Sequence, residues 1–554
     1  MRHVLPIQSR LLLGLMLLCL PSRHVVAQDG ANAQVQELLE VKNYRQAAVV
    51  ASGVGDPLDR DSLLNRIATA NPAARGGSSQ ADFDTLIDLM TATVAPGTWE
   101  DDGGTGSAEG FPSGVYVDTQ GVLQQLPNSA KKVPAQATER RPSSHRATRA
   151  IASAESTNRN FEQTSTRRKV SLSRIERQMQ MLRAAGDRPD DSLRCLGGIY
   201  RVDALFVYPE TGDIVVAGPA GAWRRDTDGR LLNAETGTPV LQLDDLVVLL
   251  RNALSERGRF GCSITPVPEN LARTQTFLTA SSKKPLPVGG RDQWLRAIRD
   301  NLGRQEITVH GVDPRTRVAR VIVEADYHMK LIGMGLEPGV PGVESYLDAV
   351  ELDAQGQVPP LEVLRWWFTL GEKDLSANET LDAFRFAGRG VVVLSENELL
   401  SKLGERIHTG KSDAMNRAFA DSFTQHFDEL AEKYPIYADL RNVFDLALVA
   451  GIIQGKQLAD QAAWSMTYFG DAGTGGLMKY AVKGMASPKE VETVINHRVL
   501  NRRVVVAGVS GGVEVRTASA VGTLRSSGSD AKTLDQLRAD SAPPSDDPHL
   551  WWWD

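Results

Sequence analysis

The stretch "VDALFVYPETGDIVVAG", residues Val202 to Gly218, decides the fold class of this chain. Two runs rich in β-branched and aromatic residues flank a Pro/Gly turn, which is the pattern of two paired strands. The next segment, "RRDTDGRLLN" at residues 224–233, adds an Asp-Gly turn of the hairpin type. An apolar helix is expected at Asp245 to Leu254. Two strands followed by a helix can bury one face of a sheet, so the pattern predicts an α+β fold.

The same order is expected twice more along the chain. Residues 305–333, "QEITVHGVDPRTRVARVIVEADYHMKLIG", predict a strand, an Asp-Pro turn, a second strand at 317–325 and a helix. The second strand rests on the alternation of apolar residues over 317–325. Asp326 would cap the following helix, which Gly333 or Gly335 would end. Residues 503–516, "RVVVAGVSGGVEVR", predict a third strand pair around a glycine-rich turn. We therefore expect repeated strand-strand-helix modules.

Two amphipathic helices are predicted in the last third of the chain, and they should form a helical hairpin. Their apolar residues recur at helical spacing, and Pro435 separates the two sets. The sets are Phe419, Phe423, Phe427 and Leu430, then Leu440, Phe444, Ala447 and Gly451. A further helix is expected at Leu172 to Ala185.

The N-terminus predicts export. Arg2 and Arg10 precede the apolar run Leu11 to Leu20, and the pattern is that of a secretory signal peptide cleaved after Ala27. Ten apolar residues are too short to cross a hydrocarbon core of about 30 Å, so no transmembrane segment is expected in the mature chain. We expect a periplasmic or extracellular protein.

Composition divides the rest of the chain. Residues 127–169 hold ten Lys and Arg against three Glu and one aromatic residue, which favours a disordered basic linker. The predicted parts are the signal peptide (1–27), a small N-terminal α+β region (28–126), the linker (127–169), an α+β domain of strand-strand-helix modules (170–345), an α+β domain with the helical hairpin (346–515) and a disordered tail (516–554). Within residues 28–126, helices are expected at Ala31–Ser52 and Asp82–Val94 and a strand at Gly114–Thr119.

Two cysteines, Cys195 and Cys262, remain once the signal peptide is removed. An even pair in an oxidising compartment predicts a disulfide between them. The alternative is two small buried apolar side chains, a common environment for cysteine.

Two motifs are weak candidates for catalysis. Glu324, Asp326 and His328 lie together, and a carboxylate can orient an imidazole for general acid/base work. An ordinary strand-to-helix junction with an Asp326–Lys330 ion pair explains the same residues. Ser510 lies in a GxSxG sequence after a strand, as in a hydrolase nucleophile elbow, but a strand pattern follows where the elbow needs a helix.

Other chemistry finds little support in the sequence. The nine histidines form no HxxxH or HExxH pair, so no metal site is expected. No cofactor motif is found either. The "GKS" at residues 410–412 lacks the first glycine of a phosphate loop and follows a helical pattern. Few aromatic residues accompany the basic linker, which disfavours single-stranded nucleic acid as a partner.

The C-terminus ends in "HLWWWD", with Trp551, Trp552 and Trp553 adjacent. Three exposed indole rings would form a patch that soluble proteins usually avoid. Either the rings fold back onto a groove of the same chain, or they form a docking peptide for a partner, because tryptophan is enriched among interface anchors.

Two regions resemble known families. The segment "LIDLMTATVAPGTWEDDGGTGS" followed by "GVYVD" resembles a helix, Trp, Gly-Gly, strand segment of exported planctomycete-type proteins, some related to the short N-terminal domains of secretins. The segments "EADYHMKLIGMGLEP", "RWWF" and "FTQHFDELAEKYPIYADLRNVFDLALVAGII" resemble an uncharacterised exported planctomycete family, a domain of unknown function, over roughly residues 193–453. The resemblance implies export and an α+β body of several parts, and it brings no catalytic residues.

These observations favour an exported non-enzymatic protein that binds other proteins or envelope polymers. The alternative is a secreted hydrolase that uses Ser510 or the His328 region.

Overall fold

The computed structural model describes part of the chain, and its α+β class confirms the predicted one. The described residues are 23–75, 107–111, 114–118, 160–226, 229–283, 286–351, 363–371, 375–388, 390–401, 403–470, 479–500, 503–524, 531–544, 547 and 549–554. Most of the expected signal peptide and linker, the expected helix 82–94 and the Trp-Gly-Gly segment lie outside these residues. Among the described helices, none is both long and apolar enough to span a bilayer.

The chain forms two compact units, residues 1–76 with 181–187, and residues 77–180 with 188–554. The first unit contains α1 (Arg23–Glu40), α2 (Tyr44–Ser52), α3 (Pro57–Ala70) and α4 (Pro72–Arg75). The single helix expected over residues 31–52 is therefore wrong. Lys42 has a positive φ of 56°, and the Asn43 side chain caps α2 by accepting from the Gln46 N–H. A capping side chain favours a new helix start over continuation.

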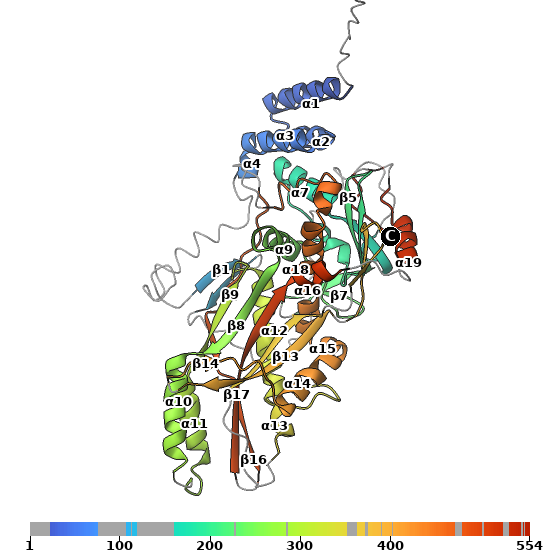
Figure 1. Ribbon diagram of the computed structural model, residues 1–554. Coiled ribbons are helices and arrows are strands. Elements are labelled where there is room, and N and C mark those ends of the chain that lie inside the picture. The colour runs from blue at the N-terminus through green and yellow to red at the C-terminus, as the bar shows by residue number, and fades with distance from the viewer. Residues whose placement is uncertain are drawn as a thin grey trace, which may run out of the picture. The chain divides into compact units, whose positions relative to one another are not determined.

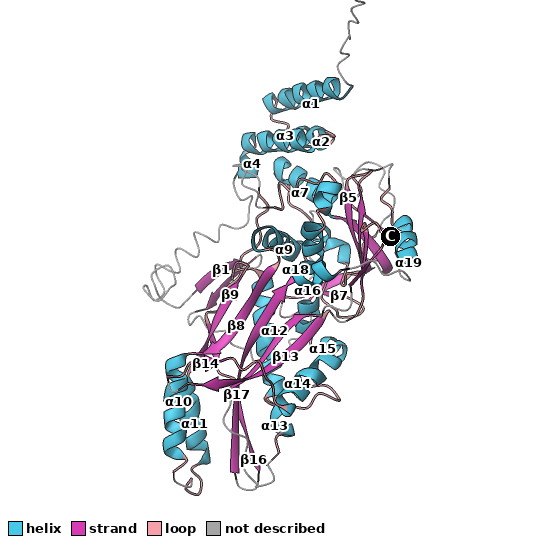
Figure 2. Ribbon diagram, viewed as in Figure 1, coloured by secondary structure: helices cyan, strands magenta, loops and turns pink. Residues whose placement is uncertain are grey.

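The second unit contains two large sheets, shown in Figures 1 and 2. One has eight strands, in the order β14-β13-β10-β17-β8-β9-β15, with β16 paired to β17. Its strands are β8 (Arg259–Pro266), β9 (Arg304–His310), β10 (Val363–Leu370), β13 (Val391–Leu400), β14 (Arg406–Ile407), β15 (Glu490–Glu492), β16 (Ile495–Leu500) and β17 (Arg503–Arg516). Because this sheet joins strands from both sides of residue 346, it does not follow the predicted division at that residue.

The other large sheet has six strands in the order β11-β12-β4-β5-β3-β18. They are β3 (Ser165–Ser171), β4 (Ala204–Tyr208), β5 (Asp213–Ala220), β11 (Leu375–Ala377), β12 (Ala383–Phe386) and β18 (Trp552–Trp553). The expected hairpin at Val202–Gly218 is confirmed as β4 and β5. Two small hairpins stand apart from these sheets: β1 (Ser107–Phe111) with β2 (Gly114–Asp118), and β6 (Trp223–Arg225) with β7 (Leu231–Asn233).

Several helices after residue 160 follow the sequence prediction. The helix expected at 172–185 is confirmed as α7 (Leu172–Ala185), and that at 245–254 as α9 (Leu243–Glu256). The helical hairpin is present as α14 (Ala414–Gln425), α15 (Phe427–Lys433) and α16 (Pro435–Gly455), with a break at His426. The remaining helical segments are α8 (Asp191–Arg194), η2 (Leu196–Gly198), α10 (Pro268–Ser281), α11 (Arg291–Leu302), α12 (Arg317–Gly333), α13 (Tyr346–Ala349), α17 (Leu458–Gln461), α18 (Thr517–Thr523) and α19 (Ala531–Asp540).

The second predicted module is wrong, because residues 317–325 form the first half of α12 and not a strand. Thr316 caps this helix by accepting from the Ala319 N–H, so Asp326 lies in the helix interior. Val321, Val323 and Ala325, whose alternation suggested a half-buried strand, are all buried, and α12 contacts β8, β17, α9 and α16. A short, continuous apolar run fits a buried helix as well as a strand.

The third predicted strand pair is one continuous strand, β17, which runs from Arg503 to Arg516. Its second half lies between β10, to which it is parallel, and β8, to which it is antiparallel. A Cβ atom on Gly511 would lie 1.8 Å from the Trp366 carbonyl oxygen, and one on Gly512 would lie 1.9 Å from the Cys262 carbonyl oxygen. These glycines therefore permit close strand approach, and no turn is formed.

The predicted disorder at residues 160–169 and in parts of the tail is also wrong. Residues 165–171 form β3, which lies between β5 and β18 in the six-stranded sheet. In the tail, α18, α19 and β18 are ordered, and Leu534 and Trp553 join the core of Phe206, Val215 and Ala217. A few apolar side chains of the polar tail are enough to anchor it to the core.

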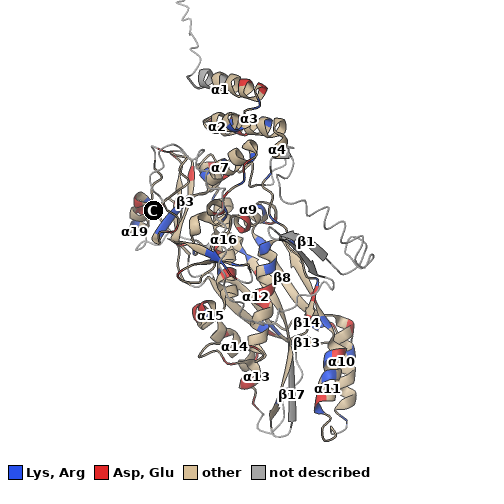
Figure 3. Ribbon diagram, turned by 180° about the vertical axis from the view of Figure 1, so that it is seen from behind, with Lys and Arg blue, Asp and Glu red and all other residues tan. Residues whose placement is uncertain are grey.

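Helices α12 and α14 pack against one face of the eight-stranded sheet, whereas α10 and α11 pack near Leu400 at the end of β13. α12 contacts β8, β10 and β17, and α14 contacts β13. Figure 1 shows the strands in front of α12, and Figure 3, viewed from behind, shows α12, α14 and α15 in front of the strands. Trp366 and Phe368 point to the helices and are fully buried, whereas their neighbours Arg365 and Trp367 are partly exposed. We call the opposite side, which carries Arg365, Trp367, Leu394, Ser263 and Thr308, the open face.

Candidate functional site

A cluster of titratable side chains lies on the open face, where β13 meets β14. Glu396 and Glu398 are two residues apart on β13, so their side chains point to the same side of the sheet. Asn397 between them points to the helical side, where its amide donates to Asp413 at 2.6 Å. His408 directly follows β14 and is brought over the two carboxylates by the β13–β14 hairpin. His408 thus meets Glu396 and Glu398, which precede it by 12 and 10 positions in the chain.

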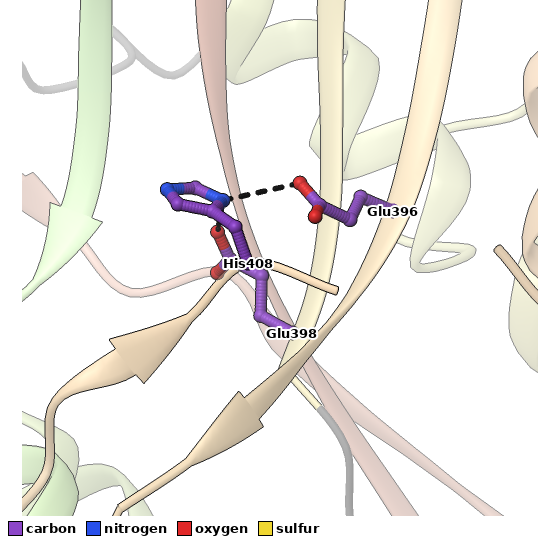
Figure 4. A group of neighbouring side chains, drawn as sticks. All are labelled: Glu396, Glu398 and His408. Carbon is purple, nitrogen blue, oxygen red and sulfur yellow. Dashed lines mark hydrogen bonds and ion pairs between the residues drawn. The ribbon is translucent and has the colours of Figure 1, made fainter. Parts of the chain in front are cut away.

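The three side chains are close enough to share one ligand. The Nδ1 atom of His408 lies 3.1 Å from Oε2 of Glu396 and 3.1 Å from Oε1 of Glu398 (Figure 4). The two carboxylates are buried, whereas the imidazole side chain is 61% exposed. Of the three side chains, only that of His408 is exposed to solvent.

Two arginines flank the carboxylates. Arg365 on β10 contacts Glu396 at 3.2 Å, and Arg406 on β14 contacts Glu398 at 3.0 Å. The backbone N–H of Gly410 donates to the other oxygen of Glu396 at 2.7 Å. Burial raises the pKa of Glu396, but the hydrogen bonds from Gly410, His408 and Arg365 outweigh it and hold the pKa below its usual value. Glu396 is therefore ionised at neutral pH.

One oxygen of the cluster has no donor. Oε1 of Glu398 is buried and accepts no hydrogen bond, although Oε2 of the same carboxylate is held by Arg406. Oε1 lies 3.1 Å from the Nδ1 atom of His408 and 3.9 Å from the Nε atom of Arg365. Burying a carboxylate oxygen without a hydrogen-bond donor costs free energy. A bound cation would offset this cost, so this oxygen is a candidate ligand.

Ser510, the predicted nucleophile, lies beside this cluster and not in an elbow. It is fully buried in the middle of β17, and its hydroxyl accepts from Arg406 at 2.9 Å. Its hydroxyl also lies 3.4 Å from the carbonyl oxygen of Leu364 and 3.5 Å from Oε2 of Glu398. A nucleophile elbow needs a sharp turn between strand and helix, and β17 supplies neither. The carboxylate near the Ser510 hydroxyl, that of Glu398 at 3.5 Å, is paired with Arg406.

The three residues of the other candidate, Glu324, Asp326 and His328, point to different places on α12. Glu324 forms an ion pair with Arg230, and the Nδ1 atom of His328 lies 2.7 Å from the Tyr437 hydroxyl. Burial, with Arg230 and Lys433, lowers the pKa of His328 to about 4. A neutral imidazole held by a tyrosine and separated from Glu324 is not a His–carboxylate pair.

Asp326 pairs with Lys330 at 2.6 Å, which confirms the expected i,i+4 ion pair. Both side chains are fully buried, and they lie in the helix interior, whereas Asp326 was expected at the helix start. Burial raises the pKa of Asp326 and lowers that of Lys330. This pair belongs to the core.

The predicted Cys195–Cys262 disulfide is not formed. Both thiols are free and buried, Cys195 just after α8 and Cys262 within β8. Burial raises the pKa of Cys195 to about 12 and that of Cys262 well above its usual value. They are the small buried apolar residues of the alternative interpretation.

The three C-terminal tryptophans are buried against their own chain. Their exposed fractions are 9%, 6% and 8%, and β18 pairs with β3. Arg168, fully buried, binds Asp554 at 2.9 Å, and its guanidinium lies 4.6 Å from the Trp552 ring centroid. Phe161 stacks on Trp551 at 5.5 Å. The rings are thus occupied within the chain, as the folding-back alternative describes.

Sequence reasoning missed Glu396, Glu398 and His408. The available signal was the Glu-x-Glu pattern in "VVVLSENELL", since alternate residues of a strand share a face. Nothing in the sequence placed His408 over them, because that position depends on the hairpin between β13 and β14.

The comparisons with known proteins support one assignment. A family model described as "Protein of unknown function (DUF1598)" matches residues 262–346, which run from β8 to α13 and include α12. No curated protein and no solved structure matches the chain. The matched range lies within the region where the sequence resembles an uncharacterised family, and it excludes Glu396, Glu398 and His408. Residues 262–346 of this chain are therefore a DUF1598 domain, a domain of unknown function.

Proposed function

We propose that this protein is an exported, non-enzymatic binding protein whose open face recognises an envelope polymer. The observation that carries the proposal is the row of side chains that crosses this face at Trp367. Register places Leu394, Trp367, Gly512, Ser263 and Thr308 side by side on five neighbouring strands. One aromatic ring thus stands between Leu394 and Gly512, in a row that continues with the hydroxyl side chains of Ser263 and Thr308.

This row suits a polar polymer better than a protein. The centre of a protein interface usually holds several apolar anchors that become fully desolvated. Here a single indole ring is held by Arg365, whose guanidinium lies 4.3 Å from the ring centroid. Its neighbours on the adjacent strands are Leu394 and Gly512, and Ser263 and Thr308 follow on the second and third strands beyond Trp367. A flat ring with hydrogen-bonding groups around it can pack against the C–H face of a sugar while its neighbours bind hydroxyl groups.

The absence of a working catalytic arrangement among the described candidates supports a binding role. Ser510 contacts Arg406 and a Glu398 carboxylate that is itself paired with Arg406, and His328 is bound to Tyr437. The signal peptide pattern supports export.

Co-sedimentation with insoluble envelope polysaccharide tests the proposal. We expect the wild type to sediment with the polymer and Trp367→Ala to remain in solution. Leu254→Ala, which changes an exposed residue of α9, is the control and should behave as wild type. Sedimentation unaffected by Trp367→Ala, or no sedimentation of the wild type, would refute it.

An activity assay tests the competing class. The wild type, Ser510→Ala and His328→Ala would be compared on broad esterase and peptidase panels. We expect no activity from any of them. Wild-type activity that either substitution abolishes would establish the hydrolase alternative.

A further inference from the structure

We propose that Glu396, Glu398 and His408 bind a divalent transition-metal ion such as Zn²⁺ on the open face. The three potential ligand atoms, one from each side chain, lie within 4.8 Å of one another. They come from one strand and the residue after its hairpin partner, so a rigid β-hairpin holds them in place.

The spacing matches that of ligands around one ion. Zn–N and Zn–O bonds are about 2.0–2.1 Å long, so neighbouring ligands of a tetrahedral ion lie about 3.3 Å apart. The two distances from His408 Nδ1 to the carboxylate oxygens are both 3.1 Å. An ion can enter with small side-chain movements, and the exposed imidazole is the side chain best able to move.

The unpaired oxygen of Glu398 is the second, independent observation. Its side chain is fully buried, and Oε1 points at His408 without accepting a hydrogen bond. The other oxygens of the cluster have donors that fix the carboxylates, since Gly410 holds Oε1 of Glu396 and Arg406 holds Oε2 of Glu398. Donors that orient a ligand from behind are characteristic of metal sites.

The donor set selects the class of ion. Imidazole nitrogen with carboxylate oxygen suits zinc and similar first-row ions, whereas calcium and magnesium prefer oxygen alone. Arg365 and Arg406 already compensate the two carboxylate charges, so we expect weaker binding than at a closed structural zinc site. Three protein ligands leave a position for water or for an oxygen atom of a bound molecule.

The competing account is that a protonated His408 is itself the cation between the two carboxylates. The two accounts differ in a direct measurement. The purified full-length chain, treated with a chelator and dialysed, is titrated at pH 7.5 with Zn²⁺ by calorimetry and with Co²⁺ by visible absorption. We expect one ion per chain in both titrations, and a cobalt spectrum of four- or five-coordinate type.

Substitutions then assign the site. His408→Ala changes an exposed side chain and should fold normally, and we expect it to weaken binding at least tenfold. His310→Ala is the matched control, because His310 is an exposed histidine of the same sheet, on β9. It should bind as wild type. Glu398→Gln should also weaken binding, with folding checked by circular dichroism.

Two results would overturn the site: no stoichiometric binding by the wild type, or equal binding by His408→Ala. The measurement needs no polymer, so it is independent of the proposed function. Trp367→Ala should retain the ion. If the polymer fails to bind while the ion is retained, the proposed function falls and the metal site stands.

Discussion

The buried pair of Asp326 and Lys330 allows a quantitative test of how α12 is fixed to the eight-stranded sheet. Both side chains are 0% exposed, and Nζ lies 2.6 Å from Oδ2. In Lys330→Met the methionine fills the space of the lysine stem, but the carboxylate of Asp326 loses its charge partner. Breaking a buried pair in this way costs about 3–5 kcal/mol.

The cost has an upper limit that depends on pH. The unpaired Asp326 can take up a proton, and starting from a pKa near 3.9 this costs about 4 kcal/mol at pH 7 and about 1.5 kcal/mol at pH 5. A group that is protonated in the folded state and ionised in the unfolded state stabilises the fold as the pH falls. The loss caused by Lys330→Met should therefore shrink by about 2.5 kcal/mol between pH 7 and pH 5.

Urea unfolding followed by tryptophan fluorescence measures the effect, because all nine tryptophans lie outside the first unit. Asp326→Leu/Lys330→Met removes both charges and should come within about 1–2 kcal/mol of wild type. Arg291→Met, which breaks the exposed pair with Asp292, should cost about 0–1 kcal/mol. The reasoning fails if Lys330→Met costs less than about 1 kcal/mol at pH 7, or if the double variant is as unstable as the single one.

Three further predictions concern the tail, a histidine and a glycine. Deletion of residues 549–554 removes three buried indole rings and leaves Arg168 without its carboxylate, so it should lower the free energy of unfolding by about 4 kcal/mol or more; an unchanged urea midpoint would contradict this. The wild type should lose up to about 3 kcal/mol as the pH falls from 6.5 to 4, because the unfolded state protonates His328 while the folded state keeps its pKa at about 4, and His328→Phe should lack this part of the slope in urea titrations at several pH values. Gly511→Ala should prevent β17 from approaching β10 and abolish soluble expression or lower the melting temperature sharply, whereas Gly522→Ala, whose Cβ meets nothing within 4 Å, should melt as wild type; equal melting of the two would show that the strand can shift.

Much of the local structure was predictable because neighbouring residues alone favour it. The hairpin at residues 202–218 and helices α7 and α9 needed only strand alternation, turn residues and helical spacing. The same holds for the apolar face that runs through α14, α15 and α16. The α+β class followed from these elements.

The candidate site was predictable only in part. Glu396 and Glu398 share a face because they are two apart on a strand, and that much is visible in the sequence. Their meeting with His408 depends on the β13–β14 pairing, and the burial of Ser510 depends on the strands on both sides of β17.

Tertiary packing decided what local patterns left ambiguous. The sequence by itself determined that residues 317–325 include four β-branched apolar residues, but burial against β8, β17, α9 and α16 makes the segment helical. The sequence also determined that positions 511 and 512 are glycines. Only the tertiary structure shows that these glycines allow β10 and β8 to approach β17 closely and do not form a turn. The sequence determined that three tryptophans end the chain, and only the edge of β3 and the buried Arg168 gave them a place to pack. In each case the observed conformation is stabilised by contacts between residues far apart in sequence, and no local pattern encodes such contacts.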